Sequence, residues 1–112
     1  VLQFFIENAN DEISRARYSA QQERSLGLGA MGLHAYYHKH RVPFGSEEAA
    51  RLNESIFKTI KQKAVEETIK LAEERGECPD MEGTGRRNSH MLAIAPNANS
   101  AILANTSPSI EP

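Results

Sequence analysis

The sequence contains no tryptophan, a single cysteine and no long apolar run. Only 6% of its 112 residues are aromatic, so a core must rest mostly on Leu, Ile and Ala. Cys78 alone cannot form an internal disulfide, and this excludes dithiol redox chemistry within the chain. No apolar run approaches the ~20 residues that a membrane span needs, and no targeting segment is visible. These absences predict a cytoplasmic protein with no membrane partner.

An excess of charge of one sign is also lacking, because the formal net charge is −2. Without a strong basic field, we expect no nucleic-acid partner. The length is enough for one small domain. However, Val1 starts within an apolar pattern and Pro112 follows no polar tail, so we expect a segment of a larger protein. The alternative is a complete small helical domain.

Helical patterns occupy most of the first half of the chain. Residues 1–8 carry apolar side chains at helical spacing, and residues 11–23 form a charged, helix-tolerant stretch that Asn10 can cap. We interpret the charged residues here as solvated or paired surface groups. They are Glu12, Arg15, Arg17, Glu23 and Arg24.

The strongest helical signal begins at Ser46, a good N-cap, and ends at Gly76, with Pro79 beyond it. Glu47 and Glu48 in the first turn suit the helix dipole. A span of roughly 30 residues would be about 45 Å long, which again indicates part of a larger body. Its buried face is predicted to comprise Ala49, Leu52, Ile56, Ile60, Ala64, Thr68 and Leu71, with Phe57 and Val65 alongside.

Two motifs have both a functional and a structural interpretation. Residues 27–32 spell G-x-G-x-x-G, which binds dinucleotides only after a buried strand, and residues 19–25 are too polar to form one. We therefore predict a helix or a strand-to-helix junction, whose glycines let another backbone come close. His34 and His38 could share a metal, but no Cys or carboxylate in that stretch completes a ligand set. Residues 38–41 are interpreted as a solvated helix end.

The segment after the long helix carries Cys78 and the pair Arg86-Arg87. Cys78 has no resolving cysteine or nearby base in the sequence, so we predict a passive residue. Residues 80–89 are predicted to form an exposed loop. In the alternative, one arginine of the pair binds a carboxylate or a phosphate.

Residues 91–105 predict a short buried strand, a tight turn after Pro96 and the start of a helix. Asn97, Asn99 and Ser100 are residue types that cap helices by accepting backbone N–H groups. Such a turn directs several N–H groups at one point, which suits an anionic oxygen such as that of a phosphate. We therefore predict an anion-binding turn.

Several segments together resemble the large (alpha) subunit of ribonucleotide reductase, of the aerobic class I, viral and bacterial type. The resemblance covers essentially the whole chain. It implies an α/β fold class, in which residues 1–112 are a fragment of the C-terminal half of the ten-stranded reductase barrel, incomplete at both ends. Within the segment, it implies mostly helix with one or two short strands. The segments that carry it are 24–34, 74–77, 83–89, 93–100 and 106–112.

The resemblance also implies that the turn binds the diphosphate of a ribonucleotide substrate. The matching positions are Asn97, Ala98, Asn99, Ser100 and Ala101. Many family members have Thr and Ser where this chain has Asn99 and Ala101. Side-chain donors are therefore fewer here, whereas backbone donors are unaffected.

The family's reaction begins when a thiyl radical removes the 3′ hydrogen of the ribose, and a cysteine pair then supplies electrons. None of those cysteines lies in this chain, and Cys78 and Glu111 match positions without a catalytic role, so no catalytic residue or metal ligand is assigned. The full enzyme implies ATP or dNTP effectors and a metal-radical cofactor in a small (beta) subunit. The implied partners are the remainder of the large subunit, a second large subunit, the small subunit, a ribonucleoside diphosphate, and thioredoxin or glutaredoxin as reductant. The alternative is a non-catalytic helical interaction or scaffold module.

Overall fold

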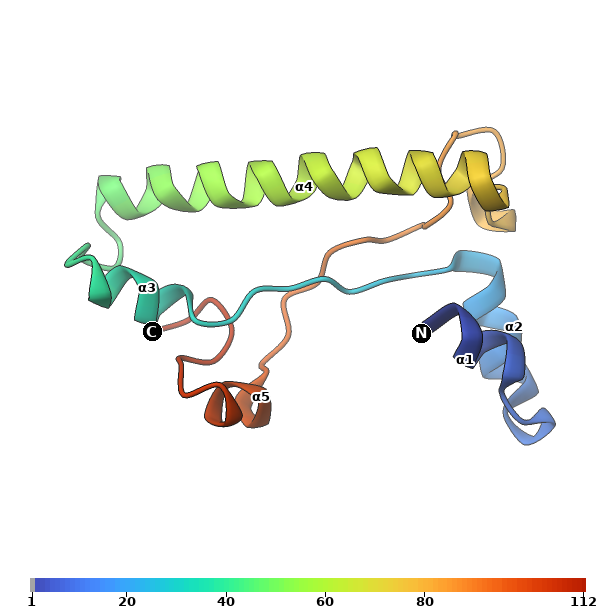
Figure 1. Cartoon of the computed structure of the whole chain (residues 1–112), viewed down its shortest axis with the longest axis horizontal. Helices are drawn as coiled ribbons and strands as arrows, with labels where there is room; N and C mark the ends of the chain where they lie inside the picture. Colours follow the sequence, from blue (N-terminus) through green and yellow to red (C-terminus); the bar gives the residue numbers. More distant parts are fainter. Residues whose placement is uncertain (1) are drawn as a thin grey trace. The chain divides into compact units, whose positions relative to one another are not determined.

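The computed structural model describes residues 2–112, with side chains from Phe4 onward, so the apolar pattern at Val1 lies outside the described residues. Helices dominate, as predicted. No strand is formed by the described residues, and a single parallel β-bridge joins Leu28 to Leu92. The elements are α1 (Leu2–Asn8), η1 (Asp11–Ile13), α2 (Ser14–Glu23), α3 (Leu33–Lys39), α4 (Glu47–Arg75), η2 (Pro79–Met81) and α5 (Ala98–Leu103) (Figure 1).

The chain divides into two compact units. The first unit comprises Val1–Leu26 and Ala64–Met91, and the second comprises Gly27–Lys63 and Leu92–Pro112. Helix α4 therefore contributes its C-terminal part to the first unit and its N-terminal part to the second. No helix in the described part of the chain is both long and apolar enough to cross a membrane.

The ends of α4 follow the sequence prediction. Ser46 Oγ accepts a hydrogen bond from the N–H of Ala49 at 3.1 Å, which satisfies one of the free donors of the first turn. At the other end, Gly76 has φ +84° and donates its N–H to the carbonyl of Ala72 at 2.8 Å. This left-handed glycine ends the helix because it has no Cβ to clash.

In the first unit, Asn88 links three segments. Thr68 of α4 is buried; its hydroxyl donates to Asn88 Oδ1 at 2.9 Å and accepts the N–H of Asn88 at 3.0 Å. Asn88 Nδ2 then donates to the carbonyl of Arg24, which follows α2, at 2.8 Å. These bonds satisfy polar groups that would otherwise be costly to bury.

The prediction of an exposed loop over residues 80–89 is wrong at Arg87 and Asn88, both of which are buried. Arg87 Nη1 donates to the carbonyls of Arg75 at 3.1 Å and Gly76 at 2.8 Å. Carbonyl groups at a helix C-terminus have no partner within the helix. The Arg87 side chain supplies that partner, and its positive charge suits the negative end of the helix dipole.

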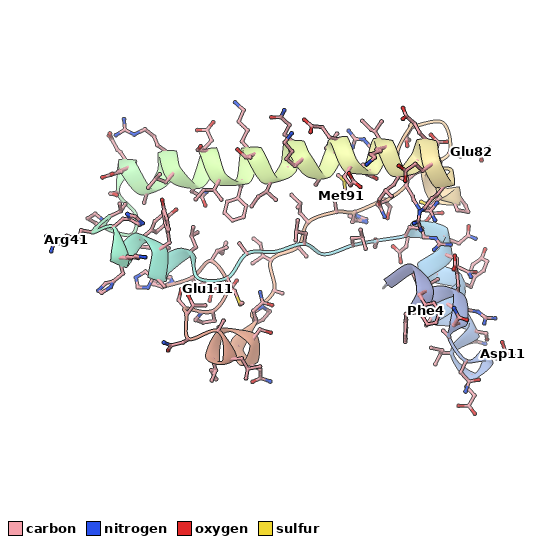
Figure 2. The ribbon with its side chains drawn as sticks, viewed as in Figure 1. Phe4, Asp11, Arg41, Glu82, Met91 and Glu111 are labelled. Carbon is pink, nitrogen blue, oxygen red and sulfur yellow. The ribbon has the colours of Figure 1, made fainter. Side chains whose placement is uncertain are left out.

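The core of the second unit lies between α3 and the N-terminal part of α4 (Figure 1). Tyr37 of α3 is buried in this core, and its hydroxyl donates to the carbonyl of Ala49 in α4 at 3.1 Å. Arg41 follows α3 in the exposed turn that leads to α4 (Figure 2). The buried members of the core are Leu33, Tyr37, Val42 and Ala49, and Leu52, Ile56, Phe57 and Ile110 pack against them.

The glycine-rich segment 27–32 is a non-helical junction that enters α3, so the prediction of a helix here is wrong. The predicted junction into a helix is observed, but Leu28 forms an isolated β-bridge in place of a strand. Ala93 donates its N–H to the carbonyl of Leu28 at 3.1 Å, so two backbones lie in direct contact. A Cβ on Gly29 would lie 2.5 Å from the carbonyl oxygen of Ala93, and a Cβ on Gly27 would lie 3.1 Å from the Ala93 methyl group. The close approach that the glycines were predicted to permit is therefore observed.

Replacing the hydroxyl of Thr68 tests the link in the first unit. We expect Thr68→Val to lower the free energy of unfolding by about 1–3 kcal/mol, because it leaves the N–H and Oδ1 of Asn88 buried without this partner. Thr59→Val is the matched control on the same helix, since Thr59 is exposed and its hydroxyl donates to the carbonyl of Ser55. Urea unfolding of the full-length protein measures both, and equal losses would contradict the role of Thr68.

Adding a methyl group to either glycine tests the backbone contact. We expect Gly29→Ala to destabilise the protein by about 1–3 kcal/mol, because the new Cβ meets a backbone oxygen that cannot rotate away. Gly27→Ala should cost less, because its Cβ meets a methyl group at a longer distance. Thermal unfolding compares the two variants, and a larger loss for Gly27→Ala would refute this account.

Candidate functional site: the turn before α5

The predicted anion-binding turn lies between Pro96 and α5. Asn97 has φ 52° and ψ 26°, a left-handed conformation that Asn tolerates better than most residues. The N–H of Ala101 donates to the carbonyl of Asn97 at 2.8 Å and closes the first turn of the helix. The prediction of a tight turn followed by the start of a helix is confirmed. The predicted cap by the Asn97 side chain is wrong, because that side chain makes no capping hydrogen bond.

The expected buried strand before the turn is also corrected. Residues 91–95 form only the bridge at Leu92, and the side chains of Leu92 and Ile94 are 37% and 72% exposed. A strand is buried when neighbouring strands or helices cover it. Here the described contact of the segment is with residues 27–29, where Leu28 is itself exposed.

The backbone at the start of α5 presents a group of hydrogen-bond donors. Ala98, Asn99 and Ser100 occupy the first helical positions, where N–H groups have no acceptor within the helix. All three residues are exposed, whereas Asn97 is half-buried. Ala101 is buried and its N–H is bonded to Asn97, so it shapes the turn from within.

Charged side chains are missing from this part of the sequence, because residues 91–110 include no Asp, Glu, Lys or Arg. An anion bound at the turn would therefore interact with N–H groups, with the Ser100 hydroxyl and with the positive end of a short helix dipole. Such a site suits an oxygen that accepts several hydrogen bonds.

The far end of α5 is attached to the start of α3. Thr106 donates its N–H to the carbonyl of Ala101 at 3.0 Å, and Gly32 donates its N–H to the carbonyl of Ser107 at 2.8 Å. Ser107 Oγ accepts the N–H of Ala35 at 3.0 Å, which is the bond that an N-cap side chain makes. These hydrogen bonds restrict α5, and the turn before it, relative to α3.

Sequence reasoning missed this attachment. The local N-cap position of α3 is Gly32, which has no side chain, so the pattern gives α3 no capping group. The hydroxyl-rich loop at residues 105–109 was the available signal for a capping side chain. Nothing in its sequence indicates that it caps α3, which lies about 70 residues earlier. A Cβ on Gly32 would lie 2.6 Å from Thr106 Oγ1, so the glycine also makes room for this loop.

An apolar hollow of about 670 Å³ lies in the same unit, beside the paired extended segments. Asn53 is the polar side chain of its lining, so the hollow suits apolar packing rather than a diphosphate. The lining consists of Leu28, Gly29, Ala30, Asn53, Phe57, Ile60, Leu92, Ala93, Ile94 and Ile110.

The other candidate groups have structural surroundings. His34 packs edge-on against Phe44 with ring centroids 6.0 Å apart, and His38 is exposed in the last turn of α3. In residues 2–112, no three His, Cys, Asp or Glu side chains come together as metal ligands would. Cys78 is buried and its thiol donates to the carbonyl of Glu23 at 3.4 Å. This burial agrees with a passive cysteine.

Comparison with known proteins supplies the family. The family described as "Ribonucleotide reductase, barrel domain" matches residues 1–85. The ribonucleoside-diphosphate reductase large subunit of Invertebrate iridescent virus 3 is 50% identical over 113 residues, with 100% of this chain and 18% of that protein covered. The corresponding subunit of Invertebrate iridescent virus 6 is 46% identical over 112 residues, with 99% of this chain and 12% of that protein covered.

A solved structure gives the same result. The class Id ribonucleotide reductase alpha subunit of Actinobacillus ureae superposes with a TM-score of 0.88 at 37% identity, covering 98% of this chain and 22% of that chain. The chain thus spans about a fifth or less of the length of the relatives it matches. The sequence resemblance and the implied barrel-fragment fold are confirmed: the chain belongs to the ribonucleotide reductase large-subunit family and carries part of its barrel domain.

Proposed function

We propose that this chain is part of a ribonucleoside-diphosphate reductase that converts ribonucleotides to deoxyribonucleotides for DNA synthesis. Its segment supplies the turn that binds the substrate diphosphate, and its helices support that turn. The observation that carries the proposal is the group of N–H donors at Ala98, Asn99 and Ser100, which follows the left-handed Asn97. The names of the viral relatives support the substrate class.

The proposed binding mechanism depends on preorganisation. Each diphosphate oxygen can accept a backbone N–H, and the donors already point in one direction because the helix orients them. The Ser100 hydroxyl adds one further donor. Because the donors are fixed before binding by the contacts of α5 with the α3 start, little conformational entropy is lost when the substrate arrives.

Residues 1–112 form part of the catalytic barrel in this proposal. The exposed apolar side chains of Leu28, Leu92 and Ile94 support it, because further barrel strands packed here would remove them from water. The bridge between Leu28 and Leu92 is then one rung of a longer sheet.

The proposed assembly contains the remainder of the large subunit, a second copy of it and a small radical-generating subunit, in the cytoplasm. The small subunit would hold the metal-radical cofactor, ATP or dNTP would act as effectors on the large subunit, and thioredoxin or glutaredoxin would supply the reducing electrons. In this assembly, the role of this chain is to bind and orient the substrate.

Binding of ADP and of adenosine to the full-length protein, measured by calorimetry, tests the turn. We expect Ser100→Ala to weaken ADP binding by about tenfold, because it removes one hydrogen bond to a charged group. Asn97→Gly should retain binding, since Gly adopts positive φ easily, whereas Asn97→Val should lose it, because a β-branched residue is strained there. Ser55→Ala, at an exposed position on α4, is the control. Adenosine binding should not change in any variant.

Intact ADP binding after both Ser100→Ala and Asn97→Val would favour a non-catalytic helical interaction or scaffold module. Reductase turnover by these 112 residues without other chains would contradict the proposal that the catalytic groups lie outside this segment.

A further inference from the structure

Arg24, at the end of α2, differs from the surface charge that the sequence predicted. Its Nη1 is buried and has no hydrogen-bond partner. Its backbone is held from both sides: the N–H donates to the carbonyl of Ala20 at 2.8 Å, and the carbonyl accepts Asn88 Nδ2 at 2.8 Å. With φ 44° and ψ 37°, the residue adopts a left-handed conformation that fixes where the side chain begins.

Two further arginines of the same unit act on this region. Burial lowers the pKa of Arg87, and the positive charges of Arg24 and then Arg75 lower it further. Cys78 and Glu7 act in the opposite direction. The positive charges of Arg24 and Arg75 therefore act on the guanidinium of Arg87, while Glu7 acts on it in the opposite direction.

Three acidic residues that neighbour these arginines in the sequence interact with other groups. Their carboxylates are directed to hydroxyl, ammonium or backbone N–H donors. Glu23 accepts hydrogen bonds from Ser19 and Ser25, Glu74 lies 4.0 Å from the Lys70 ammonium, and Glu77 accepts the N–H groups of Gly83 and Gly85.

A buried N–H of a charged group without an acceptor is costly, and nearby like charges add to that cost. An oxyanion removes both penalties, because guanidinium forms short, charge-assisted hydrogen bonds to carboxylate and phosphate oxygens. We propose that the Arg24 guanidinium anchors an oxyanion, supplied by a carboxylate side chain from a part of the protein beyond these 112 residues or by a phosphate.

The carboxylate is the favoured source, because the chain spans about a fifth of its relatives' length, so most of a polypeptide of that length would lie outside it. The inference does not depend on the diphosphate turn, since Arg24 and Asn97 belong to different units. Failure of the diphosphate proposal would therefore leave the proposal for Arg24 standing, and the reverse also holds.

Thermal unfolding of the full-length protein tests the proposal, because it shows whether removing the Arg24 charge lowers or raises the Tm. Arg24→Met keeps an unbranched stem but removes the charge, so it leaves the oxyanion unpaired. We expect the Tm to fall by about 3 °C or more, and Arg24→Lys, which keeps the charge, to recover at least half of that loss. Arg15→Met is the matched control, because Arg15 is exposed on α2, the helix that Arg24 follows. The Tm of this variant should stay within about 1 °C of that of the unmodified protein.

An unchanged or higher Tm for Arg24→Met would overturn the proposal, because it would mean that the variant only relieves repulsion. Equal losses for the Met and Lys variants, or failure of both to fold, would also overturn it. If only the Met variant fails to fold, a Lys variant with a Tm near that of the unmodified protein supports it.

Inorganic phosphate, compared with chloride at equal ionic strength, separates the two sources. A phosphate-specific rise in Tm that disappears in Arg24→Met identifies a phosphate. Destabilisation by Arg24→Met without any phosphate-specific rise identifies a carboxylate of the polypeptide.

Discussion

The contact of two backbones at Leu28 and Ala93 is the constraint on which the unit with the turn depends. Their hydrogen bond sets the separation of the extended segments. A side chain on Gly29 would collide with the Ala93 carbonyl oxygen, and one on Gly27 would crowd the Ala93 methyl group. One segment continues directly into α3, and the other continues through Pro96 to the turn. Two residues without a side chain therefore permit the backbone contact that leads, through Pro96, to the candidate substrate site.

Features that depend on neighbours in the sequence could be predicted. The bounds of α4 followed from Ser46 and Gly76, because a cap and a left-handed glycine act on the adjacent helical turn. The junction at residues 27–32 could be predicted as well, since the polar residues before it excluded the strand that a dinucleotide site needs. The turn before α5 was located by Pro96 and by the capping residue types that follow.

Features that depend on distant partners could not be predicted. Asn88 reaches a carbonyl 64 residues earlier, and the burial of Arg87 depends on the loop after α4 returning to the C-terminal end of that helix. Arg24 and Arg87 were predicted to lie on the surface from their residue type, because long charged side chains are seldom buried. At the candidate site, residue type suggested a side-chain cap at Asn97, whereas the observed contribution of Asn97 is its left-handed backbone.

The bond between Ser107 and Ala35 has a consequence for the order in which the protein forms during translation. The two residues are 72 positions apart, so a nascent chain carries α3 without this cap until Ser107 has left the ribosome. Contacts of such large sequence separation close late, because the loop entropy must be overcome first. The apolar residues Leu33 and Tyr37 of α3 can pack against Val42 and Ala49 well before then. The late bond therefore completes the start of α3 and the attachment of α5 after the core of this unit has its main members.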